Sequence, residues 1–262
     1  INLRQRKERR HAEDAAAAGD QEASASLEAK RNEKLLRHTR GMRFLHWFNA
    51  ASWILLLLTG TALMAGPSFA LFGDGFAKAV AGLFGGPASL LRFHVVWGLL
   101  WAGIIVPFFL LFKRGGLEAV REVLLTRDDI RWLMIKPLKM LGLTSKPLPP
   151  QDKYNAGQKM FAVSALAGTT VIILTGLVMT FHVGSAEVVR AAILLHKVAI
   201  MFALVGVAVH ITMAAIIVEE RPALKSMVNG YVDRRHAESH AEKWVAEVDE
   251  VAAPTDKESA GS

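Results

Sequence analysis

The stretch Ile193–Ala215, ILLHKVAIMFALVGVAVHITMAA, is apolar enough to span a lipid bilayer, yet it carries two histidines, His196 and His210. At about 1.5 Å of rise per residue, their 14-residue spacing places them about 21 Å apart along a helix. At about 100° per residue they also lie within about 40° of one face. Because ionisable residues inside a membrane span are costly, both histidines are candidates for a functional site.

The rest of the chain has the same character. Apolar residues make up 52% of its 262 residues, and they gather into four blocks instead of scattering as in a soluble domain. Each block approaches the length that crosses a bilayer. We therefore expect an all-α fold, a bundle of four transmembrane helices within residues 41–218, with spans at about 44–65, 90–112, 160–183 and 193–218.

The segments outside the spans are polar. Residues 1–40 are charged and alanine-rich, so we expect them to be disordered or loosely helical, and no secretory signal is visible there. Between the first two spans lies a Gly- and Pro-rich loop with turn chemistry. The connection 113–159 contains an amphipathic stretch, 117–141, that suits a helix on the membrane surface. The tail 219–262 begins with a basic, amphipathic segment to about Trp244, and the polar, acidic remainder is expected to be disordered.

The basic residues predict the topology. Lys and Arg number 11 in the N-terminal flank to residue 43, ten in 113–159 and six in the tail, whereas the opposite loops hold only Lys78, Arg92 and Arg190. This contrast predicts that both termini and the middle connection lie on the cytoplasmic side of the membrane. The net charge of +7 therefore reflects membrane orientation and not nucleic-acid binding.

Cofactor chemistry is limited by the absence of cysteine. A disulfide framework, an intrinsic iron–sulfur cluster and a thioether-attached haem are excluded. Any redox cofactor must be held by other side chains, and histidine is the obvious choice.

Depth in the membrane sorts four histidines into two pairs. The first span runs outward, so His46 lies near the inner face together with His210. The second and fourth spans begin outside, so His94 and His196 lie near the outer face. Two stacked bis-histidine sites are typical of a transmembrane cytochrome with two haems b, because neutral imidazole suits iron and electron-transferring haem takes two axial ligands.

Neighbouring residues bear on this interpretation. Glycines in the spans would let a porphyrin approach the backbone, although they also permit close helix packing. These are Gly60, Gly98, Gly176 and Gly206. Arg43, Arg92 and Lys197 could pair with haem propionates or simply mark membrane ends. His182 competes as an outer ligand but stands at a helix end. Zinc is the less suitable metal, because its sites gather three or four ligands at one point.

Several motifs resemble the cytochrome b (gamma) subunit of respiratory membrane-bound formate dehydrogenases over about residues 38–245. The most specific are DKYNAGQK at 152–159, the LLH…VH pattern from Leu194 to His210, and SMVNGYVDRRHAESHAEKW at 226–244. The Arg-x-x-His-Trp start, Arg43 to Trp47, is shared with hydrogenase and thiosulfate-reductase cytochromes b.

The resemblance implies a function and its partners. Electrons from formate would leave a periplasmic molybdenum- or tungsten-pterin (alpha) subunit through an iron–sulfur (beta) subunit. They would cross the outer and inner haems and reduce quinone near the cytoplasmic side. The family's ligand pairs fall on the same four histidines. Its quinone site falls on Asn155 and Gly157, with Gln158 a weaker candidate, although Asn155 could equally be a helix N-cap.

Two other functions stay open. The chain could be the cytochrome b of a NiFe hydrogenase or a related periplasmic oxidoreductase, because the long N-terminus, larger middle connection and extended tail depart from the formate dehydrogenase pattern. It could also be a haem-free membrane anchor or transporter. In none of these cases would the chain alone oxidise formate, since it lacks ligands for molybdopterin metals or clusters.

Overall fold

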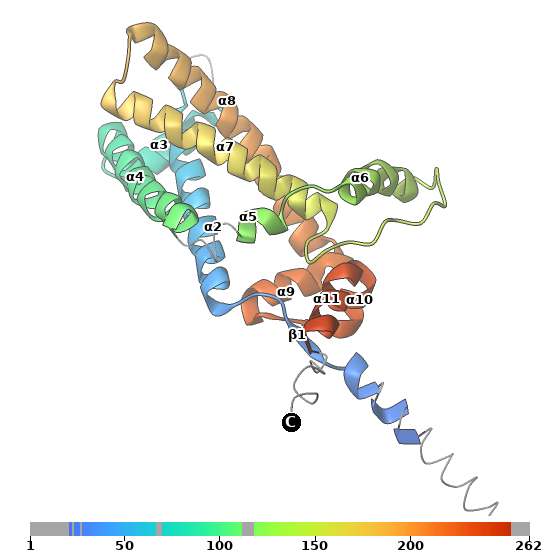
Figure 1. The fold of residues 1–262 in the computed structure, drawn as a ribbon. Coiled ribbons are helices and arrows are strands. Elements are labelled where there is room, and N and C mark those ends of the chain that lie inside the picture. The colour runs from blue at the N-terminus through green and yellow to red at the C-terminus, as the bar shows by residue number, and fades with distance from the viewer. Residues whose placement is uncertain (1–20, 23, 27, 67–69, 112–117, 253–262) are drawn as a thin grey trace, which may run out of the picture.

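The computed structural model describes residues 21–252, except 23, 27, 67–69 and 112–117. Our expectations for residues 1–20 and 253–262 lie outside this range. Within it, helices dominate and one small sheet joins the two ends of the chain (Figure 1). The elements are β1 (Lys34–Leu36), α2 (Arg40–Leu63), α3 (Gly73–Leu83), α4 (Pro87–Leu111), α5 (Glu118–Glu122), α6 (Arg127–Met140), α7 (Ala156–Phe181), α8 (Ala186–Ile211), α9 (Arg221–Asn229), β2 (Tyr231–Asp233), α10 (Arg234–His240) and α11 (Glu242–Ala252).

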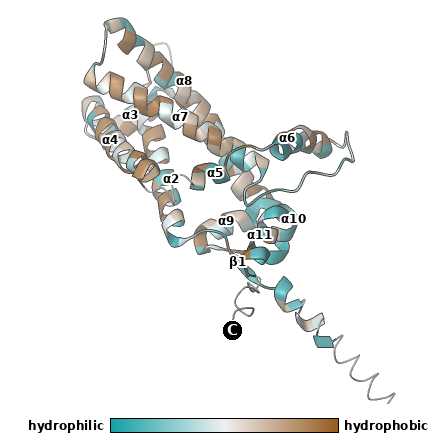
Figure 2. Ribbon diagram, in the orientation of Figure 1, coloured by the Kyte–Doolittle hydropathy of each residue, from teal (hydrophilic) through white to brown (hydrophobic). Residues whose placement is uncertain are grey.

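Four of the described helices are long and apolar enough to cross a membrane: α2, α4, α7 and α8, the last extended by a π-helical turn at Thr212–Ile216. Many of their large apolar side chains are exposed, for example Phe202 at 76% and Leu110 at 70%. Figure 2 shows the apolar residues concentrated on these four helices. Such surfaces suit lipid and not water, so the predicted bundle of four spanning helices is confirmed.

The spanning helices begin three to seven residues before the predicted spans, because helices start at their caps and not where the apolar run starts. The side chain of Thr39 accepts a hydrogen bond from Met42 N, which starts α2. Asn155 caps α7 in the same way. The first turn of α8 is polar and carries an ion pair of 2.8 Å between Glu187 and Arg190.

Two ends of the bundle can be distinguished (Figure 1). At the α3 end, α3 links α2 to α4, and the short turn between α7 and α8 lies at the same end. Helix α3 was not predicted, because its Gly- and Pro-rich flanks obscure it. Its residues Phe76 and Val80 pack against Ala62 and Leu90 of the neighbouring spans, so the linker has a small apolar core.

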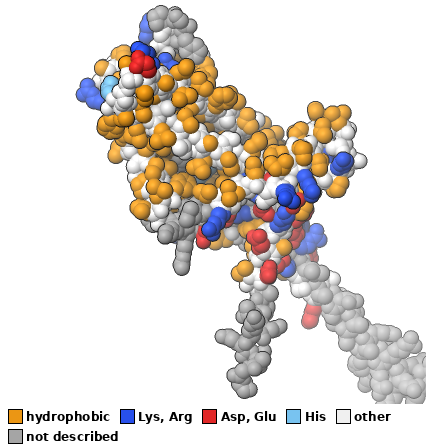
Figure 3. All heavy atoms as spheres, turned by 45° about the horizontal axis from the view of Figure 1, so that its top comes forward, with side chains coloured by type: hydrophobic (Ala, Val, Ile, Leu, Met, Phe, Trp, Pro, Cys, Tyr) orange, Lys and Arg blue, Asp and Glu red, His pale blue; other side chains and the backbone are white. Residues whose placement is uncertain are grey.

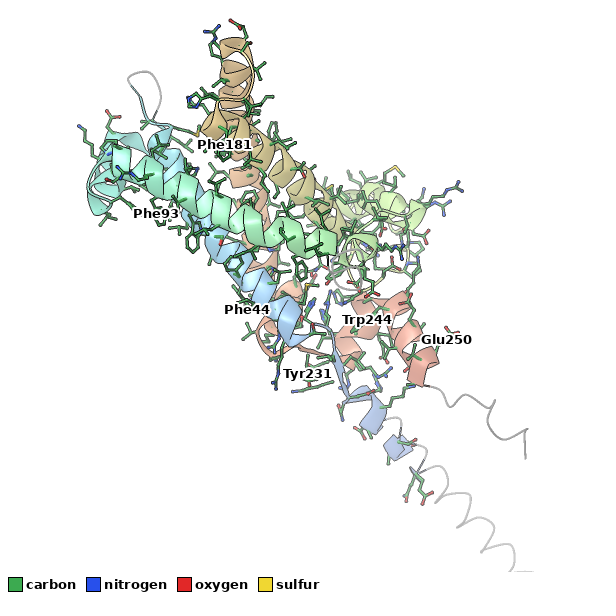
Figure 4. The ribbon with its side chains drawn as sticks, turned by 60° about the vertical axis from the view of Figure 1, so that its left-hand side comes forward. Phe44, Phe93, Phe181, Tyr231, Trp244 and Glu250 are labelled. Carbon is green, nitrogen blue, oxygen red and sulfur yellow. The ribbon has the colours of Figure 1, made fainter. Side chains whose placement is uncertain are left out.

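The termini end carries β1, β2, α6 and α9–α11. Strands β1 and β2 pair antiparallel, with Lys34 opposite Asp233 and Leu36 opposite Tyr231. A core of buried residues surrounds this pairing: Leu35, Val232, Ala237, Ala241, Trp244 and Val245. The expectation that residues 1–40 are disordered or loosely helical was therefore wrong for residues 34–38, because Leu35 is buried and the strand has a distant partner. The expectation of disorder after Trp244 was wrong as far as Ala252, because α11 continues to that residue. Figure 4 shows Tyr231 and Trp244 at this end, with Phe93 and Phe181 toward the other.

The middle connection holds two helices and not the single one predicted for 117–141. Helix α6 begins at a capping box in which Thr126 and Asp129 bond reciprocally. A buried ion pair of 2.9 Å joins Asp129 to Lys159 of α7, with both side chains 1% exposed. Charged side chains gather at this end and apolar ones cover the bundle (Figure 3).

Candidate functional site

The first candidate site is a cavity among the four spanning helices toward the α3 end. Its volume is about 680 Å³, and both His94 of α4 and His196 of α8 line it. Cofactor sites usually measure about 300–1,000 Å³ and are mostly apolar. Gly98 and Gly176 also line the cavity, as does Arg92. The structure thus brings the predicted outer pair to one space that can accept a large flat group.

The two imidazoles in this cavity are held in matching ways. Nδ1 of His94 lies 2.8 Å from Oγ1 of Thr59 on α2, and Nδ1 of His196 lies 2.8 Å from Oγ1 of Thr175 on α7. A glycine follows each threonine. A Cβ atom at Gly60 would lie 3.1 Å from Cε1 of His94. The missing side chain therefore leaves room for the ring that the hydroxyl contacts.

The second candidate site lies toward the termini end, where His46 of α2 faces His210 of α8. Their ring centroids are 6.4 Å apart, with the planes inclined at 57°. Metal–imidazole bonds of about 2 Å on opposite sides of one metal ion would separate the two ring centroids by about 6 Å. Phe161 of α7 stacks on His210 with centroids 4.4 Å apart. A Cβ atom at Gly206 would lie 3.6 Å from Phe161.

Each pair could supply two imidazole ligands to a haem iron, whereas zinc sites usually gather three or four ligands at one point. Within the described residues no three His, Cys, Asp or Glu side chains form a cluster that could hold a metal ion. His182 lines the same cavity as the outer pair without joining such a cluster. It ends α7 in the left-handed region at φ 51°.

Arginines lie near both pairs. At the inner pair, NH1 of Arg43 donates to the carbonyl of Val228, and Nε is buried without a partner among the described residues. An acidic group beside it, such as a propionate, would satisfy that donor. Trp47, one residue after His46, donates to Met227 O at 2.9 Å, so α9 holds the start of α2 in place.

The predicted quinone residues form a helix cap. Oδ1 of Asn155 accepts from Gln158 N at 2.9 Å, and Oε1 of Gln158 accepts from Asn155 N at 3.2 Å. A Cβ atom at Gly157 would lie 3.3 Å from Asn155 Oδ1 and 3.9 Å from the Trp132 ring. The space beside Gly157 is thus lined by protein atoms, and within the described part of the chain the side-chain N–H groups of Asn155 and Gln158 have no hydrogen-bond acceptor. The quinone assignment itself stays a prediction.

A buried polar cluster adjoins this cap. His38 is 5% exposed and stacks on Tyr154 with ring centroids 6.0 Å apart. NH2 of Arg37 donates to Lys153 O at 2.6 Å. Burial, followed by the charges of Arg37 and Lys153, lowers the pKa of His38 to about 3. Burial likewise raises the pKa of Tyr154 to about 12. His38 and Tyr154 are therefore neutral at pH 7.

Sequence reasoning missed the two threonines. The signal was present as a repeated tripeptide, Leu58-Thr59-Gly60 in α2 and Leu174-Thr175-Gly176 in α7. The role of this tripeptide can be recognised only when the packing of the helices is known, because each threonine contacts a histidine on the next spanning helix.

The chain is similar to known cytochrome b proteins. A family model described as prokaryotic cytochrome b561 matches residues 37–230. The chain is 25% identical to the formate dehydrogenase cytochrome b556 subunit of Haemophilus influenzae, over 85% of this chain and 87% of that protein. It is also 25% identical to the cytochrome b556(fdo) subunit of Escherichia coli K12, over 84% and 95% of the two chains. The nitrate-inducible cytochrome b556(Fdn) subunit of that strain is 27% identical over 67% of this chain and 77% of its own length.

Proposed function

Because the chain belongs to the prokaryotic cytochrome b561 family, we propose that it is the membrane cytochrome b subunit of a formate dehydrogenase complex. It is a multi-pass membrane protein. The names of its relatives support formate as the electron source. Its partners are an iron–sulfur (beta) subunit and a molybdenum- or tungsten-pterin (alpha) subunit, and the electron acceptor is the quinone pool.

The observation that carries this proposal is the arrangement of histidines on α8. His196 and His210 both come from this helix, one near each end of the bundle, and each meets a histidine of another span. We assign His46 and His210 to an inner haem b and His94 and His196 to an outer one. Haem iron, when bound, carries one electron at a time between Fe(II) and Fe(III). The protein's part is to hold the four imidazoles at two depths and to keep the space between them apolar.

Arginines near these pairs complete the assignment. Arg92 lines the outer cavity, and Nε of Arg43 is an unsatisfied donor near the inner pair. Both guanidiniums suit haem propionates, because an Arg–carboxylate bond compensates the burial of each charge.

Quinone reduction is assigned to the termini end, beside the inner pair. Asn155 caps α7 there, and Gly157 and Gln158 lie in its first turn; the side-chain N–H groups of Asn155 and Gln158 would donate to a quinone carbonyl. Lys and Arg are concentrated at this end. This concentration supports an orientation in which the termini end lies on the cytoplasmic side of a bacterial inner membrane. Protons for the reduced quinone would then come from the cytoplasmic water.

His210→Ala tests the electron path in the intact complex. We expect the inner haem to be lost and quinone reduction to stop, while dye-coupled formate oxidation by the partner subunits continues. His182→Ala is the matched control, since this histidine lines the outer cavity but is not assigned as a ligand. It should keep both haems and normal quinone reduction. Normal quinone reduction in His210→Ala would refute the path.

Analysis of the purified complex distinguishes the proposed function from the two alternative functions. Co-purified subunits with molybdenum or tungsten support formate dehydrogenase, whereas nickel in the partner would identify a hydrogenase cytochrome b. A purified chain with no b-type alpha band and no haem iron would leave a haem-free anchor or transporter.

A further inference from the structure

We propose that Thr59 and Thr175 are positioning residues that accept the Nδ1–H of His94 and His196, and that this lowers the reduction potential of the outer haem. The inference rests on the proposed assignment of these histidines as ligands of the outer haem. It concerns the hydroxyls and not the ligands themselves.

The hydrogen bonds fix which ring nitrogen carries the proton. Oγ1 of Thr59 donates its own hydrogen to the carbonyl of Leu55 at 2.8 Å, and Oγ1 of Thr175 donates to Val171 O at 2.6 Å. A carbonyl can only accept, so the hydroxyl oxygens have lone pairs and no hydrogen left for the rings. With each hydroxyl hydrogen given to its carbonyl, Nδ1 of each histidine is assigned as the donor. Nε2 is left with a free lone pair, which is the form that binds iron.

Burial makes this contact effective. Thr59 is 1% exposed and Thr175 is 8% exposed, so water does not compete for either hydroxyl group. The glycine after each threonine faces the same imidazole, and a Cβ atom at Gly176 would lie 3.6 Å from Cε1 of His196. Each Thr-Gly pair therefore sets both the proton position and the rotation of one ring.

An ordinary structural role does not account for these contacts. Threonines in membrane helices often donate to a carbonyl one turn back, and Thr61 and Thr170 do so at 2.7 and 2.9 Å. Neither of these has a histidine partner among the described residues. The hydroxyls of Thr59 and Thr175 make the same backbone bond and, in addition, the bond to a ring. This additional hydrogen bond is made from two different helices, to both histidines that line the outer cavity.

The inner pair is held differently. His210 is stacked on Phe161, and His46 meets the edge of Trp47 with ring centroids 5.4 Å apart. Within the described part of the chain, no side-chain hydrogen bond reaches the ring nitrogens of either residue. An accepted Nδ1–H makes an imidazole more basic and stabilises Fe(III) over Fe(II). The hydroxyls should therefore lower the potential of the outer haem only.

The test is a redox titration of the alpha band, with low-spin ferric electron paramagnetic resonance, on the purified complex. Thr59→Val removes the acceptor at nearly constant volume, and Thr61→Val is the matched control two residues away. We expect Thr59→Val to move one of the two redox components to higher potential and to alter one ferric signal. Thr61→Val should move neither, and Thr59→Ser should restore both. Thr59→Val is a clearer test than Thr175→Val, because the His196 ring that Thr175 contacts also interacts with the carbonyl of Ile172.

The outcomes are distinguishable. Unchanged potentials and signals in Thr59→Val would overturn the inference while leaving the two haems in place. If Thr59→Val lost the outer haem, retention at wild-type potential in Thr59→Ser would support it. Loss in both variants would overturn it, since the hydroxyl would then not be the feature that matters. A wild-type complex without two haem components would refute the proposed function itself.

Discussion

Replacing Lys159 by Met should detach α6 from the bundle. Nζ of Lys159 lies 2.9 Å from Asp129 and also donates to Asp152. The side chains of Lys159 and Asp129 are 1% exposed, and that of Asp152 is 34% exposed. Met fills the space of the lysine stem but leaves the carboxylate of Asp129 buried without its cation. Two hydrogen bonds from Thr126 would remain on that carboxylate.

The expected cost follows from this burial. Removing one partner of a buried pair costs about 3–5 kcal/mol, because the remaining charge is uncompensated. The partly solvated Asp152 and the bonds from Thr126 favour the lower part of that range. For a chain of this size such a loss lowers the melting temperature by about 6–20 °C. Lys153→Met is the matched control, since Lys153 pairs with Glu122 at 2.9 Å but both side chains are more exposed. That pair should contribute about 0–1 kcal/mol.

Thermal unfolding in detergent, together with chymotryptic cleavage of the segment after α6, measures the effect; neither variant removes a chymotryptic site there. Lys159→Met should melt earlier and be cut sooner than Lys153→Met. The double variant Lys159→Met/Asp129→Asn should recover part of the loss, because no charge is then left buried alone. Equal melting temperatures for Lys159→Met and Lys153→Met would show that the buried pair does not hold α6. Purely additive changes in melting temperature in the double variant would exclude coupling between Lys159 and Asp129.

Two further predictions concern the same end of the molecule. Asn155→Asp keeps an oxygen for the cap of α7 but loses the side-chain amide donors, whereas Asn155→Ala loses both. Loss of the cap alone lowers the free energy of unfolding by about 0.5–2 kcal/mol. Slower quinone reduction in Asn155→Asp at an unchanged melting temperature would support quinone binding, and normal kinetics would leave Asn155 as a cap. The bond from Arg234 lowers the pKa of Asp249, with Lys30 contributing less. Its stabilising effect is therefore complete above the ordinary carboxyl pKa of about 4 and is lost as pH falls through the lowered value, so cleavage of α11 by pepsin should rise as the pH falls below about 4. Asp249→Asn should lose this pH dependence, and an unchanged acid profile would contradict it.

The spans were predictable because hydrophobic length is a local property. The residues 193–218 contain enough apolar side chains to identify α8 without reference to any other segment. The starts of the helices were less predictable, since the Glu187–Arg190 pair makes the first turn of α8 look like loop. The pairing of His46 with His210 followed from depth alone and agrees with a centroid distance of 6.4 Å.

Long-range contacts were beyond the sequence. Strand β1 has three residues, and its partner lies about 200 positions further on, so no periodicity could reveal it. Lys159 counted as one more cytoplasmic cation, although the structure buries it against Asp129. The proposed role of Thr59 and Thr175 depends on a histidine that lies on another helix. In each case the deciding interaction joins segments that no sequence window contains.

The pairing of β1 with β2 has a consequence for the order of events during synthesis. The backbone N–H groups of Arg37 and His38 donate to Gly230 O at 2.8 and 3.1 Å, so the entry to α2 is held by a residue that follows α8. Gly230 has φ +96°, and a Cβ atom there would lie 2.9 Å from His38 O, so only glycine fits this approach. The first helix leaves the ribosome long before that glycine exists. The entry to α2 can therefore take its final position only after residue 230 has been synthesised, when α2, α4, α7 and α8 have all been made.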